Sequence, residues 1–145
     1  MDAIGGLNHW LDQIDLMLEP KQRRELMRRL AQGLRVRFRD RIKQQRDPDG
    51  NRFIPRKRDQ TGKIKRNATL FQKIGKQLKT EYSDNHAVVG FGGRTGFVAS
   101  VHQEGKTIRP SKNAKPTRYP IRQVVGFSKD DEQWIKSEIQ KFLTI

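Results

Sequence analysis

His102 and Glu104 stand two residues apart and are the best candidates for acid–base chemistry in the chain. A histidine beside a carboxylate can transfer protons near neutral pH when a nucleophile and a substrate cleft accompany it. The surrounding sequence shows no nucleophile motif and no signal for a cleft. We therefore interpret His102 as a structural residue, and we predict that the protein has no catalytic residues and is not an enzyme.

Two glycine-rich stretches resemble phosphate-binding loops only in part. Residues 90–96 include four glycines, but Thr95 stands where the dinucleotide fingerprint requires a glycine. Residues 105–107 (GKT) end like a P-loop, but Ser100 takes the place of its first glycine. We interpret both stretches as turn or loop glycines and expect no cofactor.

The sequence also argues against a metal site. Residues 47–51 (DPDGN) have the spacing of the first ligands of a calcium loop, but Arg52 and Arg58 occupy its sixth and twelfth positions. The chain has no cysteine, and its three histidines have no companion at ligand spacing. Residues 47–50 instead predict a tight turn, because proline fixes φ and glycine accepts a positive φ.

Charge is the strongest compositional signal. The net charge is +15, and residues 21–66 hold eighteen Lys and Arg against five acids. Such a block implies a polyanionic neighbour, either nucleic acid or an acidic protein surface. Only 33% of the residues are hydrophobic, which suggests surfaces that become buried in an assembly. No apolar run reaches the roughly 18 residues that span a membrane, so we expect no membrane partner.

A long basic helix is predicted from Lys21 to about Arg46. Its apolar side is formed by Met27, Leu30, Ala31, Leu34, Phe38 and Ile42. Beside it, helical geometry groups six cations on an arc of about 60°: Lys21, Arg24, Arg28, Arg35, Arg39 and Arg46. Like charges in one helix repel, and a polyanion would remove that repulsion. We predict that this arc faces DNA.

The next segment, residues 52–66, is polar and strongly basic. It cannot bury enough apolar surface to offset the entropy of its ordering. We expect a mobile arm, in which Arg56, Lys57 and Arg58 contact neighbouring proteins.

The remaining pattern predicts an α+β fold, with a small antiparallel sheet packed against helices. A first helix ends before Pro20, with an apolar stripe formed by Leu7, Leu11, Ile14 and Leu18. Further elements are a helix over 68–80, a hairpin of strands 86–91 and 97–101, a strand over 119–127, and a last helix capped by Ser128 and Asp131. We expect the hairpin to form the floor of the core and Ala99 to be buried.

Several short motifs recur in a fixed order along the chain. The predicted strand 97–101 runs into A-x-x-H-Q-x-G, formed by Ala99, His102, Gln103 and Gly105. Before it lie Q-x-x-P-D-G, with Pro48, Asp49 and Gly50, and a short helix that begins at Leu70. After it come P-x-R and G-F-S-x-x-D, with Pro120, Arg122 and Gly126.

In this order and spacing, the motifs resemble the phage virion morphogenesis family. That family includes the tail completion proteins of contractile-tailed temperate phages and their Mu-like relatives. The resemblance spans roughly Leu7 to Leu143. One departure is Phe53, which stands where relatives often have tryptophan and which we expect to keep only the packing role.

The resemblance implies one domain over residues 1–145 and a structural virion protein required for tail completion. It implies a ring at the head-proximal end of the tail, near the neck, and we consider six copies as one ring size. The partners would be further copies, tail tube, sheath and neck proteins, and phage DNA bound without sequence preference. The protein would be assembled in the host cytoplasm and reside in the virion.

Two alternatives stay open: a head-completion or connector protein of the neck, and a plain basic nucleic-acid-binding protein. For a ring, we expect the contacts to come from the stripe that ends at Leu18 and from the C-terminal Trp134, Ile139 and Phe142.

Overall fold

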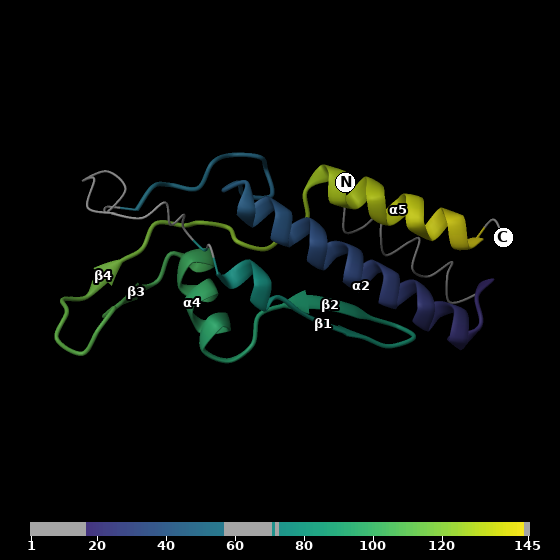
Figure 1. Ribbon diagram of the computed structural model, residues 1–145, viewed down its shortest axis with the longest axis horizontal. Helices are drawn as coiled ribbons and strands as arrows, with labels where there is room; N and C mark the ends of the chain where they lie inside the picture. Colours follow the sequence, from purple (N-terminus) through teal and green to yellow (C-terminus); the bar gives the residue numbers. More distant parts are fainter. Residues whose placement is uncertain (1–16, 57–70, 72, 144–145) are drawn as a thin grey trace. The chain divides into compact units, whose positions relative to one another are not determined.

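The computed structural model describes residues 17–56, 71 and 73–143, and it has the predicted α+β class (Figure 1). The described elements are, in chain order, α2 (Pro20–Lys43), the 3-10 helix η1 (Ile74–Gln77), β1 (Lys79–Tyr82), β2 (Ala87–Gly90), α4 (Gly93–Glu104), β3 (Thr107–Ile108), β4 (Thr117–Arg118) and α5 (Lys129–Leu143). Within the described part of the chain, no helix combines the length and the apolar character needed to cross a membrane.

Two compact units make up the chain. Unit 1 comprises Met1–Arg37, Lys79–Val89 and Phe127–Ile145, and unit 2 comprises Phe38–Leu78 and Gly90–Gly126. The long helix α2 begins at Pro20, as predicted, and contributes residues to both units. The predicted apolar side of this helix is confirmed, because all six of its side chains are buried.

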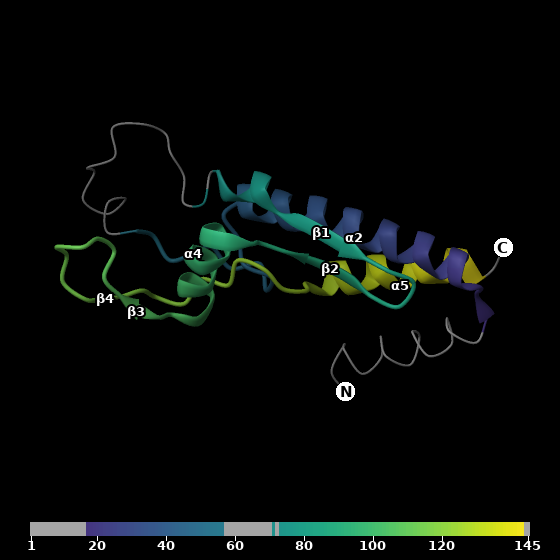
Figure 2. The same cartoon turned by 90° about the horizontal axis from the view of Figure 1, so that it is seen from below.

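In unit 1, helices α2 and α5 pack side by side (Figure 1 and Figure 2). The ring of Trp134 lies against Gly33, where a Cβ would overlap it. One turn or more away on each helix, the guanidinium of Arg29 lies 5.3 Å from the ring centre of Phe142. Since the later residue of α5 meets the earlier residue of α2, the two helices run antiparallel. Ile139 of α5 is fully buried.

The predicted capping box at the start of α5 is confirmed. The backbone N–H of Asp131 donates to Oγ of Ser128 at 3.0 Å, and the N–H of Ser128 donates to a carboxylate oxygen of Asp131 at 2.9 Å. The other carboxylate oxygen accepts from Nε of Arg37 at 2.7 Å. Asp131 thereby caps α5 and ties it to α2 with the same buried side chain.

Strands β1 and β2 form a hairpin whose turn is closed by a 2.9 Å bond from the N–H of Ser83 to the carbonyl of His86. The guanidinium of Arg24 lies 5.0 Å from the ring centre of Tyr82, so the hairpin contacts α2. The predicted strand 86–91 corresponds to β2, but its partner is β1 and not residues 97–101. The predicted helix over 68–80 is wrong at its end, because residues 79 and 80 belong to β1.

Residues 93–104 form helix α4, so the predicted strand 97–101, and the hairpin that we expected as the floor of the core, are wrong. The alternation of apolar and polar residues predicted a strand wrongly, because α4 exposes an apolar side chain and buries a polar one. Apolar Phe97 is 53% exposed, whereas polar His102 is only 8% exposed. Ala99 is buried as expected, but on a helix.

The rest of unit 2 consists mainly of loops around a small core. Strand β3 pairs antiparallel with β4, and Thr107 stands opposite Arg118. The predicted strand over 119–127 is wrong, because these residues form no regular ladder. Their bonds go instead to side chains, as described below. The stripe residues Leu7, Leu11 and Ile14, the residue Leu70, and most of the arm that we expected over 52–66 lie outside the described residues.

Candidate functional site

The C-terminal half of α4 lies against residues 119–126 in unit 2, and most of the predicted motif residues meet there. The backbone N–H of Arg122 donates to the carbonyl of His102 at 2.8 Å. Pro120 is half-buried in the same segment, and Ala99 is buried one turn before His102. The motifs are therefore one structural cluster, although 20 residues separate His102 from Arg122.

Gln103 takes the place of a neighbouring strand for the backbone of residues 124 and 125. Its Oε1 accepts the N–H of Val124 at 2.7 Å and the N–H of Val125 at 3.1 Å. Its Nε2 donates to the carbonyl of Val125 at 3.0 Å. Both ends of one amide are thus used to satisfy backbone groups, which stay paired although no strand forms.

His102 lies in a small aromatic cluster. Its ring meets those of Phe71 and Tyr119 edge to face, with centres 4.7 and 5.1 Å away, and Phe71 meets Phe53 at 5.5 Å. Phe53 is buried, as expected for a residue with a packing role. Burial first, and the nearby charge of Arg122 second, lower the pKa of His102 to about 4.

Arg122 connects this cluster to the chain after the predicted 47–50 turn. Its guanidinium is buried and donates at 2.9 Å to Nδ1 of His102. It also donates to the carbonyl of Ile54 at 2.7 Å and to that of Pro55 at 3.2 Å. Because arginine stays protonated, Nδ1 of His102 must be the acceptor, so the imidazole is neutral.

Two glycines of the motifs are required by space and by backbone conformation. Gly105 ends α4 with φ of 67°, and a Cβ there would lie 2.7 Å from Cγ1 of Ile121. Gly126 has φ of 150°, and a Cβ there would lie 3.0 Å from Cγ of Pro48. Side chains at either position would be strained.

Pro48 is buried against Gly126 and so brings the predicted 47–50 turn to the cluster. Oδ1 of Asp47 accepts the N–H groups of Asp49 at 3.0 Å and Asn51 at 2.9 Å. Gly50 has φ of 88° and donates its N–H to the carbonyl of Asp47 at 3.0 Å. The turn is therefore confirmed, with Asp49 and Gly50 exposed at its tip.

The predicted DNA-facing cations do not form one uniform row. Arg46 lies beyond the end of α2 and donates at 2.7 Å to the carbonyl of Gly50. Arg28 donates to Glu25 at 2.8 Å, and this hydrogen bond holds the pKa of Glu25 below its usual value. Arg39 pairs with Asp40 at 3.3 Å. Lys21 and Arg24 are exposed on α2, and Arg35 is half-buried.

Of the three predicted protein-contact residues in the arm, Arg56 is half-buried just after the carbonyls held by Arg122. Lys57 and Arg58 lie outside the described residues.

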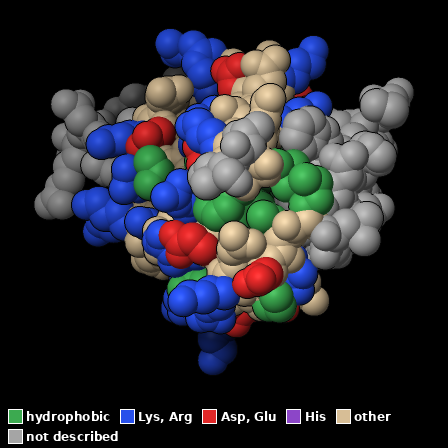
Figure 3. Space-filling model, turned by 90° about the vertical axis from the view of Figure 1, so that its right-hand side faces the viewer, with side chains coloured by type: hydrophobic (Ala, Val, Ile, Leu, Met, Phe, Trp, Pro, Cys, Tyr) green, Lys and Arg blue, Asp and Glu red, His purple; other side chains and the backbone are tan. Residues whose placement is uncertain are grey.

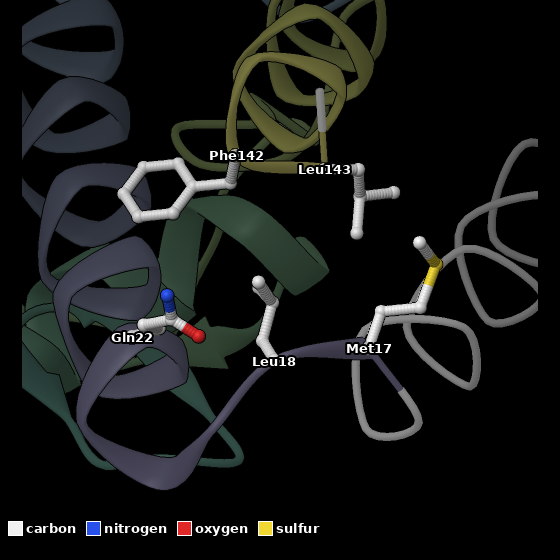
Figure 4. A pocket seen from close by; sticks show the side chains of 5 residues that line it. All are labelled: Met17, Leu18, Gln22, Phe142 and Leu143. Atoms are coloured by element: carbon white, nitrogen blue, oxygen red, sulfur yellow. The ribbon is translucent and has the colours of Figure 1, made fainter. Parts of the chain in front are cut away.

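A hollow of about 320 Å³ lies in unit 1 and is lined by Met17, Leu18, Gln22, Phe142 and Leu143 (Figure 4). On the face drawn in Figure 3, hydrophobic side chains gather near the centre, with Lys and Arg around them. Four of the five lining residues are apolar, and none has a titratable side chain. The hollow therefore offers shape but no group for chemistry.

The hydrogen bonds of the cluster around α4 hold backbone segments in place. The Nδ1 lone pair of His102 is used by Arg122, so this nitrogen cannot act as a base. Among the described residues, no three His, Asp or Glu side chains come close enough to hold a metal ion.

Sequence reasoning missed three contacts that shape the units: Gly33 with Trp134, Arg37 with Asp131, and Arg41 with the carbonyl of Gly126. These pairs are far apart in the chain, so no local pattern signals them. It also assigned no role to the cations at every third position from Lys106 to Arg118, although that spacing is visible in the sequence.

Comparison with known proteins gives two matches. The phage virion morphogenesis family matches residues 3–144. Tail completion protein S of Escherichia phage P2 is 36% identical over an alignment of 129 residues, and the alignment covers 84% of this chain and 85% of that protein. No solved structure matches the chain significantly.

Proposed function

This chain belongs to the phage virion morphogenesis family, and from that membership we propose that it is a structural virion protein that completes the phage tail. The observation that carries the proposal is the 36% identity to tail completion protein S across most of both chains. We also propose that residues 1–145 act as one family domain built from the two compact units.

The chemistry of the motif cluster supports an assembly role. Its polar side chains bond to backbone groups of the same unit, as Gln103 does with residues 124 and 125. Arg122 holds the carbonyls of Ile54 and Pro55, directly before the basic residues 56–58. These bonds fix the backbone where the basic segment begins. From there, Arg56, Lys57 and Arg58 contact acidic surfaces of tail or neck proteins.

Within the virion, we place the protein in a ring of copies at the head-proximal end of the tail, near the neck. Of the C-terminal residues that we expect at the ring contact, Trp134 and Phe142 also pack on α2 within unit 1 and are half-buried there, and Ile139 is buried. Both units expose apolar side chains, and in unit 2 these are Phe97, Val98, Ile121 and Ile54. A ring needs such a patch on each copy to meet a different patch on the next.

DNA contact by α2 is a further part of this proposal, and the ion pairs limit it to part of the arc. Arg28 and Arg39 have carboxylate partners, whereas Lys21 and Arg24 are exposed. Arg24 lies over the ring of Tyr82 from the hairpin, but α2 itself places no aromatic side chain between the cations of the arc, which suits contact with a phosphate backbone better than base stacking.

A phage that lacks the gene for this chain tests the tail role. We expect filled heads and defective tails, with infectivity restored when the wild-type chain is supplied from a plasmid. Electron microscopy with antibody-labelled virions should find the chain at the head-proximal end of the tail. Normal tails together with empty or leaking heads would favour the head-completion alternative and contradict the proposal.

The net charge of +15 keeps a plain nucleic-acid-binding protein as the second candidate. The two candidate functions predict different behaviour of the protein. A tail component should be incorporated into purified virions in a fixed number of copies. A plain binding protein should be absent from virions and bind cellular nucleic acid with a steep dependence on salt.

A further inference from the structure

The segment between α4 and residue 119 is an ordered basic hairpin, to which nothing above assigns a role. We call residues 106–118 the basic ribbon. It holds five cations at every third position and no acid: Lys106, Arg109, Lys112, Lys115 and Arg118. No acidic residue occurs between Glu104 and Asp130.

The basic ribbon is held at its base and turned at its tip. Gly105 ends α4 in a left-handed conformation, and the N–H of Tyr119 donates to the carbonyl of Lys106 at 3.0 Å. Strands β3 and β4 pair above this bond, and at the tip the N–H of Ala114 donates to the carbonyl of Ser111 at 3.1 Å. The cations of the ribbon are therefore presented by a defined backbone.

Four of these cations are open to an external anion. Arg109, Lys112, Lys115 and Arg118 are exposed, and within the described residues none of them forms an ion pair. Lys106 differs, since it lies 3.4 Å from the carboxylate of Glu104. A free cation gains more from a phosphate than a cation that a carboxylate already neutralises, as at Arg28 on α2.

The residues between the cations decide which polyanion fits. Protein interfaces depend on a few large anchors, most often Trp, Tyr and Arg. Among residues 106–118 the one large apolar side chain is Ile108, which is half-buried, and there is no aromatic residue. Their small polar side chains, at Ser111, Asn113 and Thr117, are typical donors to phosphate and sugar oxygens. Pro110 and Pro116 also remove backbone N–H donors at the ribbon edges, which disfavours the addition of a partner strand.

From this composition and geometry, we propose that the basic ribbon binds the phosphate backbone of duplex DNA without reading its sequence. A two-stranded ribbon fits the major groove, which is about 12 Å wide. Its cations then neutralise phosphates and release their condensed counterions. This site lies in unit 2 and does not depend on the proposed contact of the α2 arc with DNA.

The test measures binding of the full chain to a fluorescent duplex DNA at several salt concentrations. In the ribbon variant, Arg109, Lys112 and Lys115 are changed to Gln. In the control variant, Lys73, Lys76 and Lys79 are changed to Gln, which removes the same charge from other exposed positions. For the ribbon variant we expect the slope of log K against log salt to fall by about 1 per residue, and affinity at moderate salt to fall at least about tenfold. The control slope should change by less than about 1.

A measurement on the unmodified chain guards against misfolded variants. Acetylation of lysine amines, read by mass spectrometry, should slow at Lys112 and Lys115 when duplex DNA is added, but not at Lys73 or Lys76. Equal losses in the ribbon and control variants, or unprotected ribbon lysines on bound DNA, would overturn the proposal. So would a ribbon variant that binds DNA normally but fails to bind an acidic protein surface in the virion.

Discussion

At the scale of single residues, the cluster depends on a neutral histidine and a buried arginine. His102 and Arg122 share one buried hydrogen bond, and the guanidinium also donates to two backbone carbonyls. Such a bond exists only while Nδ1 of His102 carries no proton, because a charged imidazole donates from both nitrogens. Protonation of His102 at low pH should therefore break this bond and destabilise the cluster.

We expect His102 to reduce stability as the pH falls from about 6.5 towards 4. Its pKa is lowered to about 4 in the folded protein, so the unfolded chain binds more protons in this window and folding weakens as the pH falls. Thermal melting of wild type and of His102→Gln should show this, since glutamine can accept from Arg122 but does not titrate. The melting temperature of the variant should fall less between pH 6.5 and 4.5. Parallel curves would contradict the assignment.

Arg122→Lys should destabilise the protein although the charge is kept. An ammonium group cannot reach the imidazole and both carbonyls in the way a planar guanidinium does. If the buried Nδ1 of His102 is left without a donor, the cost is about 1–3 kcal/mol in the free energy of unfolding, which a urea titration can measure. Arg118→Lys, at an exposed position of β4, is the matched control and should stay within about 0.5 kcal/mol of wild type. Equal stability of both variants would show that the hydrogen bonds of the Arg122 guanidinium do not stabilise the fold.

At the scale of secondary structure, the sequence predicts an element well where its apolar pattern matches its burial. Helix α2 was found because Met27, Leu34 and Ile42 repeat with helical spacing and are all buried. Helix α5 was found because Ser128 and Asp131 form a local cap. Both signals are local, so they can be seen without the fold.

Helix α4 could not be predicted in this way. Its buried face includes His102, whereas Phe97 and Val98 are exposed, so its hydrophobic pattern has no helical period. The strand predicted over 119–127 failed for a related reason, since its partner is the side chain of Gln103. In the site, the order of the motifs predicts the residues as a group, and their contacts depend on tertiary structure.

Gly105→Ala tests how α4 ends. The substitution places a Cβ at φ of 67° and 2.7 Å from Ile121, so we expect a loss of about 1–3 kcal/mol in the free energy of unfolding. Gly90→Ala is the control, because nothing lies within 4 Å of a Cβ at that position and its φ is ordinary. It should be neutral or slightly stabilising. If both variants unfold at the same urea concentration, the left-handed end of α4 is not required.

At the scale of the whole molecule, the distribution of apolar side chains separates those needed for folding from those available for assembly. Trp134 and Ile139 of α5 are used within unit 1. Phe97 and Val98 are exposed on α4 although the same helix buries Ala99 and Val101. Exposed apolar side chains that do not support their own unit are typical of surfaces that meet another protein.

We therefore expect Phe97→Lys with Val98→Lys to fold normally but to fail in assembly. Helical geometry leaves both side chains in solvent, so the cost in stability should stay below about 1 kcal/mol. The strand that the sequence suggested would instead have buried Phe97 beside Ala99, and the same change would then unfold the protein. Circular dichroism distinguishes these two cases.

Val88→Lys, at a residue of β2 that is also exposed, is the matched control. Only the α4 variant should lose oligomers, as read by native mass spectrometry of the purified chain. Only that variant should also lose infectivity in the complementation assay. Normal oligomers and normal virions from a folded α4 variant would mean that the ring contact lies on a different surface.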